Sequence, residues 1–390
     1  MTLSLAATLP ADHATASLVG RVWRPDVQGP SVVAIRDGRA IDVTAAFPTV
    51  RDLCEASRPA LALGATAGED LGPIDAILAN TPPAGRDRAR PWVLAPCDLQ
   101  AIKAAGVTFA VSMLERVIEE RARGNPDAAA AIRAEILRLV GEDLQKLVPG
   151  SPEAMELKRV LIAQGAWSQY LEVGIGPDAE IFTKAPPMAA VGTGAEVGLH
   201  PISTWNNPEP EIVLAVSSAG EAVGATLGND VNLRDVEGRS ALLLGKAKDN
   251  NASAAIGPFL RLFDEGFTID HVRSATVSLR VEGPDGFTLD GASSLAKISR
   301  DPLALVAQMM GPHHQYPDGA MLYLGTMFAP VKDRHAPGQG FTHVVGDVVT
   351  IASPWLGSLV NTVTTSDKAE PWTFGASHLA RNLARRGMLV

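Results

Sequence analysis

The part of the sequence that most constrains the fold begins at Gly174, where short apolar runs bounded by Gly, Pro and Asp follow one another. Runs of this length, rich in β-branched residues and separated by turn residues, indicate β-strands. They are EIFTKAP, EIVLAVSS, AVGATLGNDV, ATVSLRVEG, FTLDGAS, AMLYLGT, DVVTIAS and GSLVNTVT. Two other segments, AAIGPFLRLFD and DPLALVAQMM, are expected to be helices. This pattern predicts a mixed, β-rich body within an α+β fold.

The preceding segment, residues 98–165, has a helical pattern, with apolar residues three and four positions apart. Asp98, Asn125 and Ser151 are residue types that suit the N-cap of a helix. We expect a helical lid region at about residues 98–165.

The N-terminal part of the chain differs from both. Residues 17–44 are expected to form short strands, with Asp37-Gly38 as a hairpin turn. The Ala, Gly and Pro-rich stretch that follows is expected to hold one or two helices and a linker. We therefore predict a small N-terminal domain at 1–90 and a catalytic domain at 91–390.

Composition narrows the class of partner. The 390 residues carry a net charge of −9, which argues against nucleic acid or an anionic membrane as the main partner. Cys54 and Cys97 lack the spacing of a zinc or redox motif. The first residues have no positive region ahead of their short apolar stretch, and no long uncharged apolar window follows. A soluble cytoplasmic protein is expected.

The stretch NPEPEIVLAV raises a question of electrostatics, because Glu209 and Glu211 are two residues apart at the start of a strand-like run. Alternate strand residues share a face, so these carboxylates would lie roughly 7 Å apart and repel each other. A solvated strand end is the simplest interpretation. If EIVLAV and AVGATLG form a hairpin, however, Asp230 returns towards both glutamates. Three carboxylates suit a hard cation such as Mg²⁺, with Mn²⁺ or Ca²⁺ as substitutes.

Several of these segments, in order and at similar spacing, resemble landmarks of the fumarylacetoacetate hydrolase superfamily. They are PEPEIVLAV, GNDVNLRD, GKAKDNNASAAIGP, YLGT and GDVVTIASPWLGSLVNTV, and the resemblance covers roughly residues 175–365. It implies a mixed β-roll, with the helical region as an insertion. It also implies a homodimer or homotetramer.

The resemblance also implies roles for single residues. The metal ligands correspond to Glu209, Glu211 and Asp230, and the lysine of the GK motif corresponds to Lys246, with Lys248 as a substitute. Substrate-binding positions fall on the residues Arg234 and Thr326.

One motif departs from the family pattern. Many hydrolases of this superfamily have a helix start resembling G-x-N-Y-x-x-H-x-x-E, whose His and Glu activate water. This chain reads GVTFAVSMLE, so Ser112 stands in place of the His while Glu115 is retained. A serine hydroxyl has no pKa near neutrality and does not replace imidazole as a general base. We count Ser112 as a substrate-binding candidate.

A second branch of the superfamily dehydrates 2-keto-3-deoxy sugar acids and needs only the metal site and proton transfers. The loss of the His weakens the case for hydrolysis and leaves dehydration untouched. We therefore expect a Mg²⁺-dependent lyase that converts a 2-keto-3-deoxypentonate to 2-oxoglutarate semialdehyde. A carbon–carbon hydrolase of acylpyruvates or diketo-deoxy sugar acids is the alternative, and a non-catalytic relative is the third hypothesis.

Acid–base residues complete the set. Glu180 and Lys246 are the expected proton-transfer pair, with Lys184 close to Glu180 as a substrate-binding candidate. Glu115 is a further catalytic candidate and, with Arg116 beside it, is expected to approach from the helical lid. The histidines at 313, 314, 335 and 343 match no ligand spacing and are expected to lie in loops.

Overall fold

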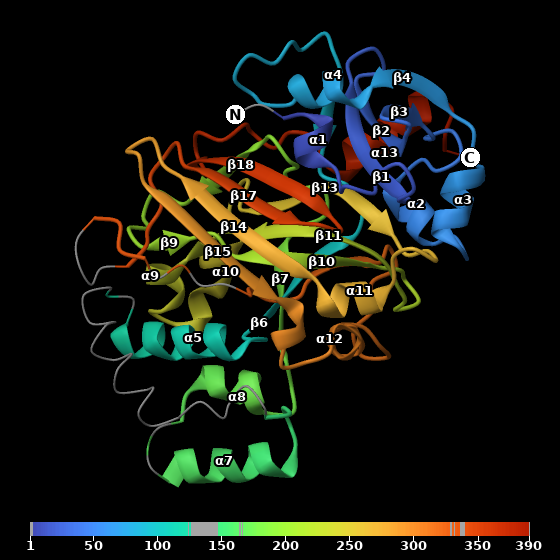
Figure 1. Cartoon of the computed structure of the whole chain (residues 1–390). Coiled ribbons are helices and arrows are strands. Elements are labelled where there is room, and N and C mark those ends of the chain that lie inside the picture. Colours follow the sequence, from blue (N-terminus) through green and yellow to red (C-terminus); the bar gives the residue numbers. More distant parts are fainter. Residues whose placement is uncertain are drawn as a thin grey trace.

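The computed structural model describes residues 3–123, 125, 147–163, 165, 167–327, 330, 332–335 and 340–389. Within these ranges, two β-sheets form the body of the protein and helices surround them (Figure 1). None of the described helices is both long enough and apolar enough to span a lipid bilayer.

The larger sheet has eleven strands among the described residues and is almost entirely antiparallel, apart from the parallel pair β16 and β6. In spatial order its strands are β4 (Glu69–Pro73), β3 (Arg39–Asp42), β2 (Gly29–Arg36), β1 (Leu18–Arg24), β13 (Ala254–Leu262), β11 (Ala222–Asp230), β10 (Pro210–Val216), β16 (Ala320–Tyr323), β6 (Ala101–Gly106) and β7 (Glu180–Ala185). A further strand, β5 (Trp92–Leu94), pairs with β1.

The smaller sheet packs against the larger one. Its order is β15 (Thr288–Ser294), β14 (Thr276–Glu282), β17 (Val348–Ser353), β18 (Gly357–Thr365) and β8 (Glu196–Leu199). Strands β10, β11 and β13 contact β14, β17 and β18 across the interface. A separate two-stranded ladder joins β9 (Asn206–Asn207) to β12 (Asn232–Leu233).

The helices are mostly short. They are α1 (Leu5–Thr8), α2 (Val50–Cys54), α3 (Pro59–Ala65), α4 (Ile74–Ala79), α5 (Ala110–Ala122), α7 (Pro152–Ala163), α8 (Gln169–Ile175), α9 (Arg234–Glu237), α10 (Leu244–Lys248), α11 (Ile269–Ser274), α12 (Pro302–Met309) and α13 (Ala376–Arg385). Two 3₁₀ turns cover Ala241–Leu243 and Leu295–Lys297. In Figure 1, α5, α8 and α7 succeed one another away from the sheets.

Strand β10 is apolar from Ile212 to Val216 because both of its faces are covered. Ile212 and Leu214 belong to the core between the two sheets, while Val213 and Ala215 belong to the core on the other face of the larger sheet. Because both faces are covered, every residue of β10 is buried. This burial fixes the register of the strand that begins between Glu209 and Glu211.

The structure confirms the α+β class and the strands predicted after Gly174. It also confirms the first hairpin, since Asp37 and Gly38 connect β2 to β3 with φ angles of 48° and 70°. Positive φ at both central residues is what a two-residue hairpin turn of this type requires.

Two helix predictions are wrong. The segment AAIGPFLRLFD forms strand β13, and the first part of the expected helical lid forms strand β6. In both segments, pairing within a buried sheet outweighs a helix-like spacing of apolar residues. Helix α12 is as predicted.

The predicted N-caps had mixed outcomes. Asp98 accepts hydrogen bonds from the amides of Val50 and Arg51 at the start of α2 instead of capping a lid helix. Ser151 does lie at the start of α7 and accepts a hydrogen bond from the Ala154 amide. Asn125 falls in no described helix, and most of the helix predicted after it lies outside the described residues.

Pro210 cannot donate to a strand ladder, so the sequence predicts an edge or a bulge at this end of the strand. Strand β10 lies between β11 and β16, but its ladder with β16 begins at Val213, so Pro210 is in a ladder with β11 alone. Pro210 is the first residue of β10, where the missing N–H is tolerated.

The N-terminal segment continues the larger sheet through the antiparallel pair β1 and β13, in which Leu18 faces Arg261. In Figure 1 its blue ribbon lies at one end of the molecule, together with α13. A domain boundary near residue 90 stays a prediction.

Candidate metal and catalytic site

Three carboxylates meet at the end of the β10–β11 hairpin. Pro210 pairs with Asn229 and Glu211 with Gly228, so the register brings Asp230 beside the two glutamates. The Asp230 amide donates to the Glu209 carbonyl over 3.0 Å, and the Glu209 amide donates to the Asn229 side-chain oxygen over 3.0 Å. One oxygen from each of the three carboxylates lies within 4.8 Å of the others, and all three residues are buried.

This donor set fits a divalent cation. Burial, together with the charges of Asp230 and Glu209, raises the pKa of Glu211 well above its ordinary value. The Gly325 amide donates to Glu211 Oε2 over 2.7 Å, which orients that carboxylate. Three buried oxygen donors whose mutual repulsion is incompletely offset are the ligands that Mg²⁺ or a similar hard cation prefers. Among the described residues, no second group of His, Cys, Asp and Glu has ligand geometry.

Two buried lysines lie against the carboxylates. Lys248 Nζ lies 2.6 Å from Glu209 Oε2 and 3.1 Å from Asp230 Oδ2, while Lys184 Nζ lies 2.8 Å from Asp230 Oδ1. Burial by itself would lower the pKa of Lys248, but Asp230 and Glu209 outweigh it and raise that pKa. For Lys184 burial prevails and lowers the pKa.

The lysine preferred from the sequence is not the one that the structure places in the site. Lys246 is exposed and does not line the cavity, whereas Lys248 does. Both residues belong to α10, and side chains two positions apart on a helix point in different directions. The geometry therefore replaces Lys246 with Lys248, the substitute that the sequence also offered.

Glu180 lies at the first position of β7 and lines the same cavity. Burial, followed by the charge of Glu237, raises the pKa of Glu180 to about 7. Its partner across the β6–β7 ladder is Gly106, where an added Cβ would come within 1.9 Å of Glu180 Oε2. The glycine thus leaves room for the carboxylate beside the strand.

The cavity gathers residues that are far apart in the sequence. Its lining is Ala105, Gly106, Val107, Arg116, Glu180, Phe182, Glu209, Glu211, Asp230, Glu237, Lys248 and Thr326. Thr326 is therefore in the predicted place. Sequence reasoning missed Glu237 and Phe182, because a single Glu in a short helix and a Phe in a strand carry no motif.

Two predicted substrate-binding residues lie near the site but do not face its cavity. Lys184 is fully buried and bonds the carbonyls of Val231 and Lys248, so it supports the site from behind. Arg234 is buried against the Trp205 ring, and its Nε donates to Asn207 Oδ1 over 2.8 Å. Neither residue lines the cavity.

Of the two neighbouring residues expected to approach from the helical region, one lines the cavity. Glu115 is buried but does not line the cavity, and Arg116, next to it, does. Ser112 lies within α5, and its side chain is outside the described residues.

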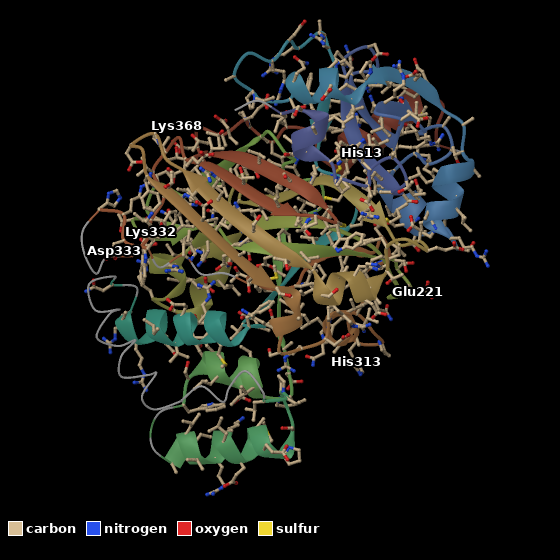
Figure 2. All side chains as sticks on the ribbon, viewed as in Figure 1. His13, Glu221, His313, Lys332, Asp333 and Lys368 are labelled. Carbon is tan, nitrogen blue, oxygen red and sulfur yellow. The ribbon has the colours of Figure 1, made fainter. Side chains whose placement is uncertain are left out.

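The histidines at 313, 314 and 343 lie in loops between the named helices and strands, as expected. His313 and His314 are exposed, and Figure 2 shows His313 at the periphery. His343 is instead buried, 2.8 Å from Asp347 Oδ2. Burial lowers the pKa of His343, so a neutral imidazole is favoured there.

Comparison with known proteins gives a consistent result. No protein-family model matches the chain. It is 31% identical over 196 residues to a probable 2-keto-3-deoxyxylonate dehydratase of Haloferax volcanii, a match that covers 50% of this chain and 64% of that protein. It is 29% identical over 184 residues to the 2-dehydro-3-deoxy-D-arabinonate dehydratase of Saccharolobus solfataricus, covering 47% of this chain and 58% of that protein. The chain thus matches less than two thirds of the length of either relative.

Solved structures share the fold. A 2-keto-3-deoxy-D-arabinonate dehydratase in its apo form superposes with a TM-score of 0.63 at 20% identity, over 89% of this chain and 99% of that one. The same enzyme complexed with magnesium and 2,5-dioxopentanoate gives 0.60 at 19% identity, with the same coverage. A 5-carboxymethyl-2-hydroxymuconate delta-isomerase from Mycobacterium smegmatis gives 0.53 at 16% identity, over 89% of this chain and 98% of that one.

These matches confirm the resemblance predicted from the sequence. The chain shares its fold with these dehydratase and isomerase structures, and part of its sequence is similar to the two pentonate dehydratases.

Proposed function

We propose that the protein is a Mg²⁺-dependent dehydratase of a 2-keto-3-deoxy sugar acid, with a 2-keto-3-deoxypentonate as substrate and 2-oxoglutarate semialdehyde as product. The observation that carries the proposal is the cavity in which the acidic triad faces Glu180 and Lys248. The names of the similar proteins support the same reaction class. The relative that binds magnesium and 2,5-dioxopentanoate supports the choice of metal and product.

The metal site would be formed by Glu209, Glu211 and Asp230. A divalent cation held there supplies a Lewis acid that polarises the ketone of a 2-keto acid and stabilises the negative charge that develops on its oxygen. Lys184 and Lys248 orient Asp230, and Lys248 also orients Glu209.

Dehydration needs a base for a C3 proton and an acid for the departing C4 hydroxyl. A carboxyl group with a pKa of about 7 is partly ionised at neutral pH, so Glu180 suits the removal of the C3 proton. The raised pKa of Lys248 keeps its ammonium charged, which suits hydrogen bonding to the departing C4 hydroxyl. The proton that Glu180 takes from C3 can then leave with that hydroxyl as water. The carbon skeleton loses one water, and a proton then moves from C5 to C3 to give the C4–C5 enol. Transfer of the enol hydroxyl proton to C4 gives the aldehyde.

The experiment that tests the proposal is product analysis with the metal-loaded protein. Incubation with Mg²⁺ and 2-keto-3-deoxypentonate should give 2-oxoglutarate semialdehyde, identified by mass spectrometry, with no product in the presence of excess EDTA. Cleavage of an acylpyruvate to pyruvate and a second acid, with no dehydration of any 2-keto-3-deoxy acid, would instead establish the hydrolase.

A further inference from the structure

Arg116 reaches the site from helix α5, which belongs to the helical region and not to the sheets. Its guanidinium forms one ion pair with Glu209 Oε1 and another, over 3.0 Å, with Glu237 Oε2. The Arg116 side chain is only 9% exposed. The ion pairs of Arg116 are therefore buried and do not lie on the protein surface.

Glu237 holds the outer side of this arginine. It is the last residue of α9, it is 4% exposed, and its Oε2 lies 4.0 Å from Lys248 Nζ. Arg116 is thus held between a predicted metal ligand and a carboxylate that has no place in the predicted metal site. Two carboxylates thus fix the plane of the guanidinium within the cavity.

The position of α5 is itself well defined. Met113, Val117 and Ile118 form one apolar core with Tyr170 and Leu171 of α8. The two helices approach closely at Gly174, where an added Cβ would come within 2.4 Å of Met113 Sδ. A rigid support of this kind is what a residue that orients a ligand requires.

We propose that Arg116 binds the carboxylate of the 2-keto acid substrate and that Glu237 positions its guanidinium, a role that rests on the proposed function. Arg116 and Lys248 are the cationic side chains among the described residues that line the cavity. In the proposed reaction Lys248 serves the departing C4 hydroxyl, so we assign the carboxylate at the other end of the reacting group to Arg116. A carboxylate that approaches the acidic triad would be repelled by Glu209, and Arg116, in contact with Glu209, offsets that repulsion.

The test measures ligand binding separately from catalysis. Isothermal titration of the Mn²⁺-loaded full-length protein with pyruvate, a 2-keto acid without a leaving group, should give an affinity that falls on the order of 10- to 100-fold in Arg116→Ala. The Mn²⁺ affinity should stay within about threefold, and millimolar guanidinium ion should restore part of the pyruvate affinity, since only the charged group was removed. With 2-keto-3-deoxypentonate, KM should rise more than kcat falls.

Three further variants make the result decisive. Arg116→Lys should retain an intermediate pyruvate affinity, and Glu237→Gln should weaken it several-fold by releasing the guanidinium. Arg159→Ala is the matched control, because Arg159 lies on α7 with its side chain 70% exposed and pairs only with neighbouring Glu156 among the ion pairs described for it. It should leave pyruvate affinity unchanged.

Unchanged pyruvate affinity in Arg116→Ala, or no pyruvate binding by the Mn²⁺-loaded wild-type protein, would overturn this role. So would a loss of Mn²⁺ affinity large enough to explain the whole effect. Arg116-dependent pyruvate binding without dehydration of any 2-keto-3-deoxy acid would support this role and refute the proposed function. Dehydration with Arg116-independent binding would do the reverse.

Discussion

The β10–β11 hairpin and helix α5 supply the site in different ways. The hairpin presents three carboxylates within 22 residues of chain, and its register alone brings them together. Helix α5 and the short helices α9 and α10 add Arg116, Glu237 and Lys248, which meet the hairpin only in the tertiary structure. The predicted metal site is therefore formed by local sequence, whereas the groups around it are brought in by tertiary packing.

The largest expected effect comes from the hairpin. Glu211→Gln removes one of three oxygen donors at nearly constant volume, and we expect Mn²⁺ affinity to fall by more than about 100-fold, with activity lost in proportion. Titration calorimetry measures the affinity. Retention of wild-type Mn²⁺ affinity in this variant would mean that the hairpin is not the metal site.

The two lysines of α10 offer a matched pair outside the hairpin. Lys248→Met removes the buried ammonium that Glu209 and Asp230 share, so we expect a loss of about 3–5 kcal/mol in stability and of about 10²- to 10⁴-fold in kcat. Lys246→Met changes an exposed residue and should alter the free energy of unfolding by less than about 0.5 kcal/mol. Equal effects of the two variants on activity and unfolding would contradict the placement of Lys248.

Glu180 tests the division between metal binding and proton transfer. Glu180→Gln should lower kcat by about 10²- to 10⁴-fold while Mn²⁺ affinity stays within about threefold. If Glu180 is the base, the wild-type rate should rise with pH as this group ionises near pH 7, and that limb should vanish from the residual rate of the variant. Turnover that survives the substitution would remove Glu180 from the mechanism.

The same substitution has a predictable effect on stability. The pKa of Glu180 is higher in the folded protein than the ordinary 4.5, so folding disfavours its ionised form. Wild-type stability is undiminished by this group below about pH 4.5, falls as the pH rises towards 7, and changes no further above 7. At pH 8 the Glu180→Gln variant should therefore unfold at a higher temperature than wild type, with a free energy of unfolding that is larger by at most about 3 kcal/mol. At pH 4 the two proteins should differ little. A difference that grows towards low pH would contradict the raised pKa.

The smallest expected effect concerns the support of α5. Ile118 is 1% exposed in the core shared with α8, and Ile118→Val should cost about 0.5–1.5 kcal/mol in stability. Because Arg116 depends on this helix and the metal ligands do not, KM should rise slightly at constant Mn²⁺ affinity. Thermal denaturation and steady-state kinetics together measure both effects.

Sequence reasoning reached the hairpin because its signals are local: an E-x-E pair, a turn and a returning Asp within one stretch. It chose the wrong lysine because Lys246 and Lys248 share one short helix, and only the packing of that helix decides which of them is buried. Glu237 was missed because nothing near it in the sequence shows that α9 lies over the cavity. Strand β13 was taken for a helix because apolar residues on a strand buried on both faces have no alternation.

We propose that the buried triad binds one divalent cation on which activity depends. Titration of Mn²⁺ into EDTA-treated protein tests this when binding and the dehydration of 2-keto-3-deoxypentonate are followed in the same samples. We expect one site per chain and activity that returns in proportion to its occupancy. The triple variant Glu209→Gln, Glu211→Gln, Asp230→Asn should show neither binding nor activity. Full activity without any divalent ion, or unaltered binding in that variant, would contradict it.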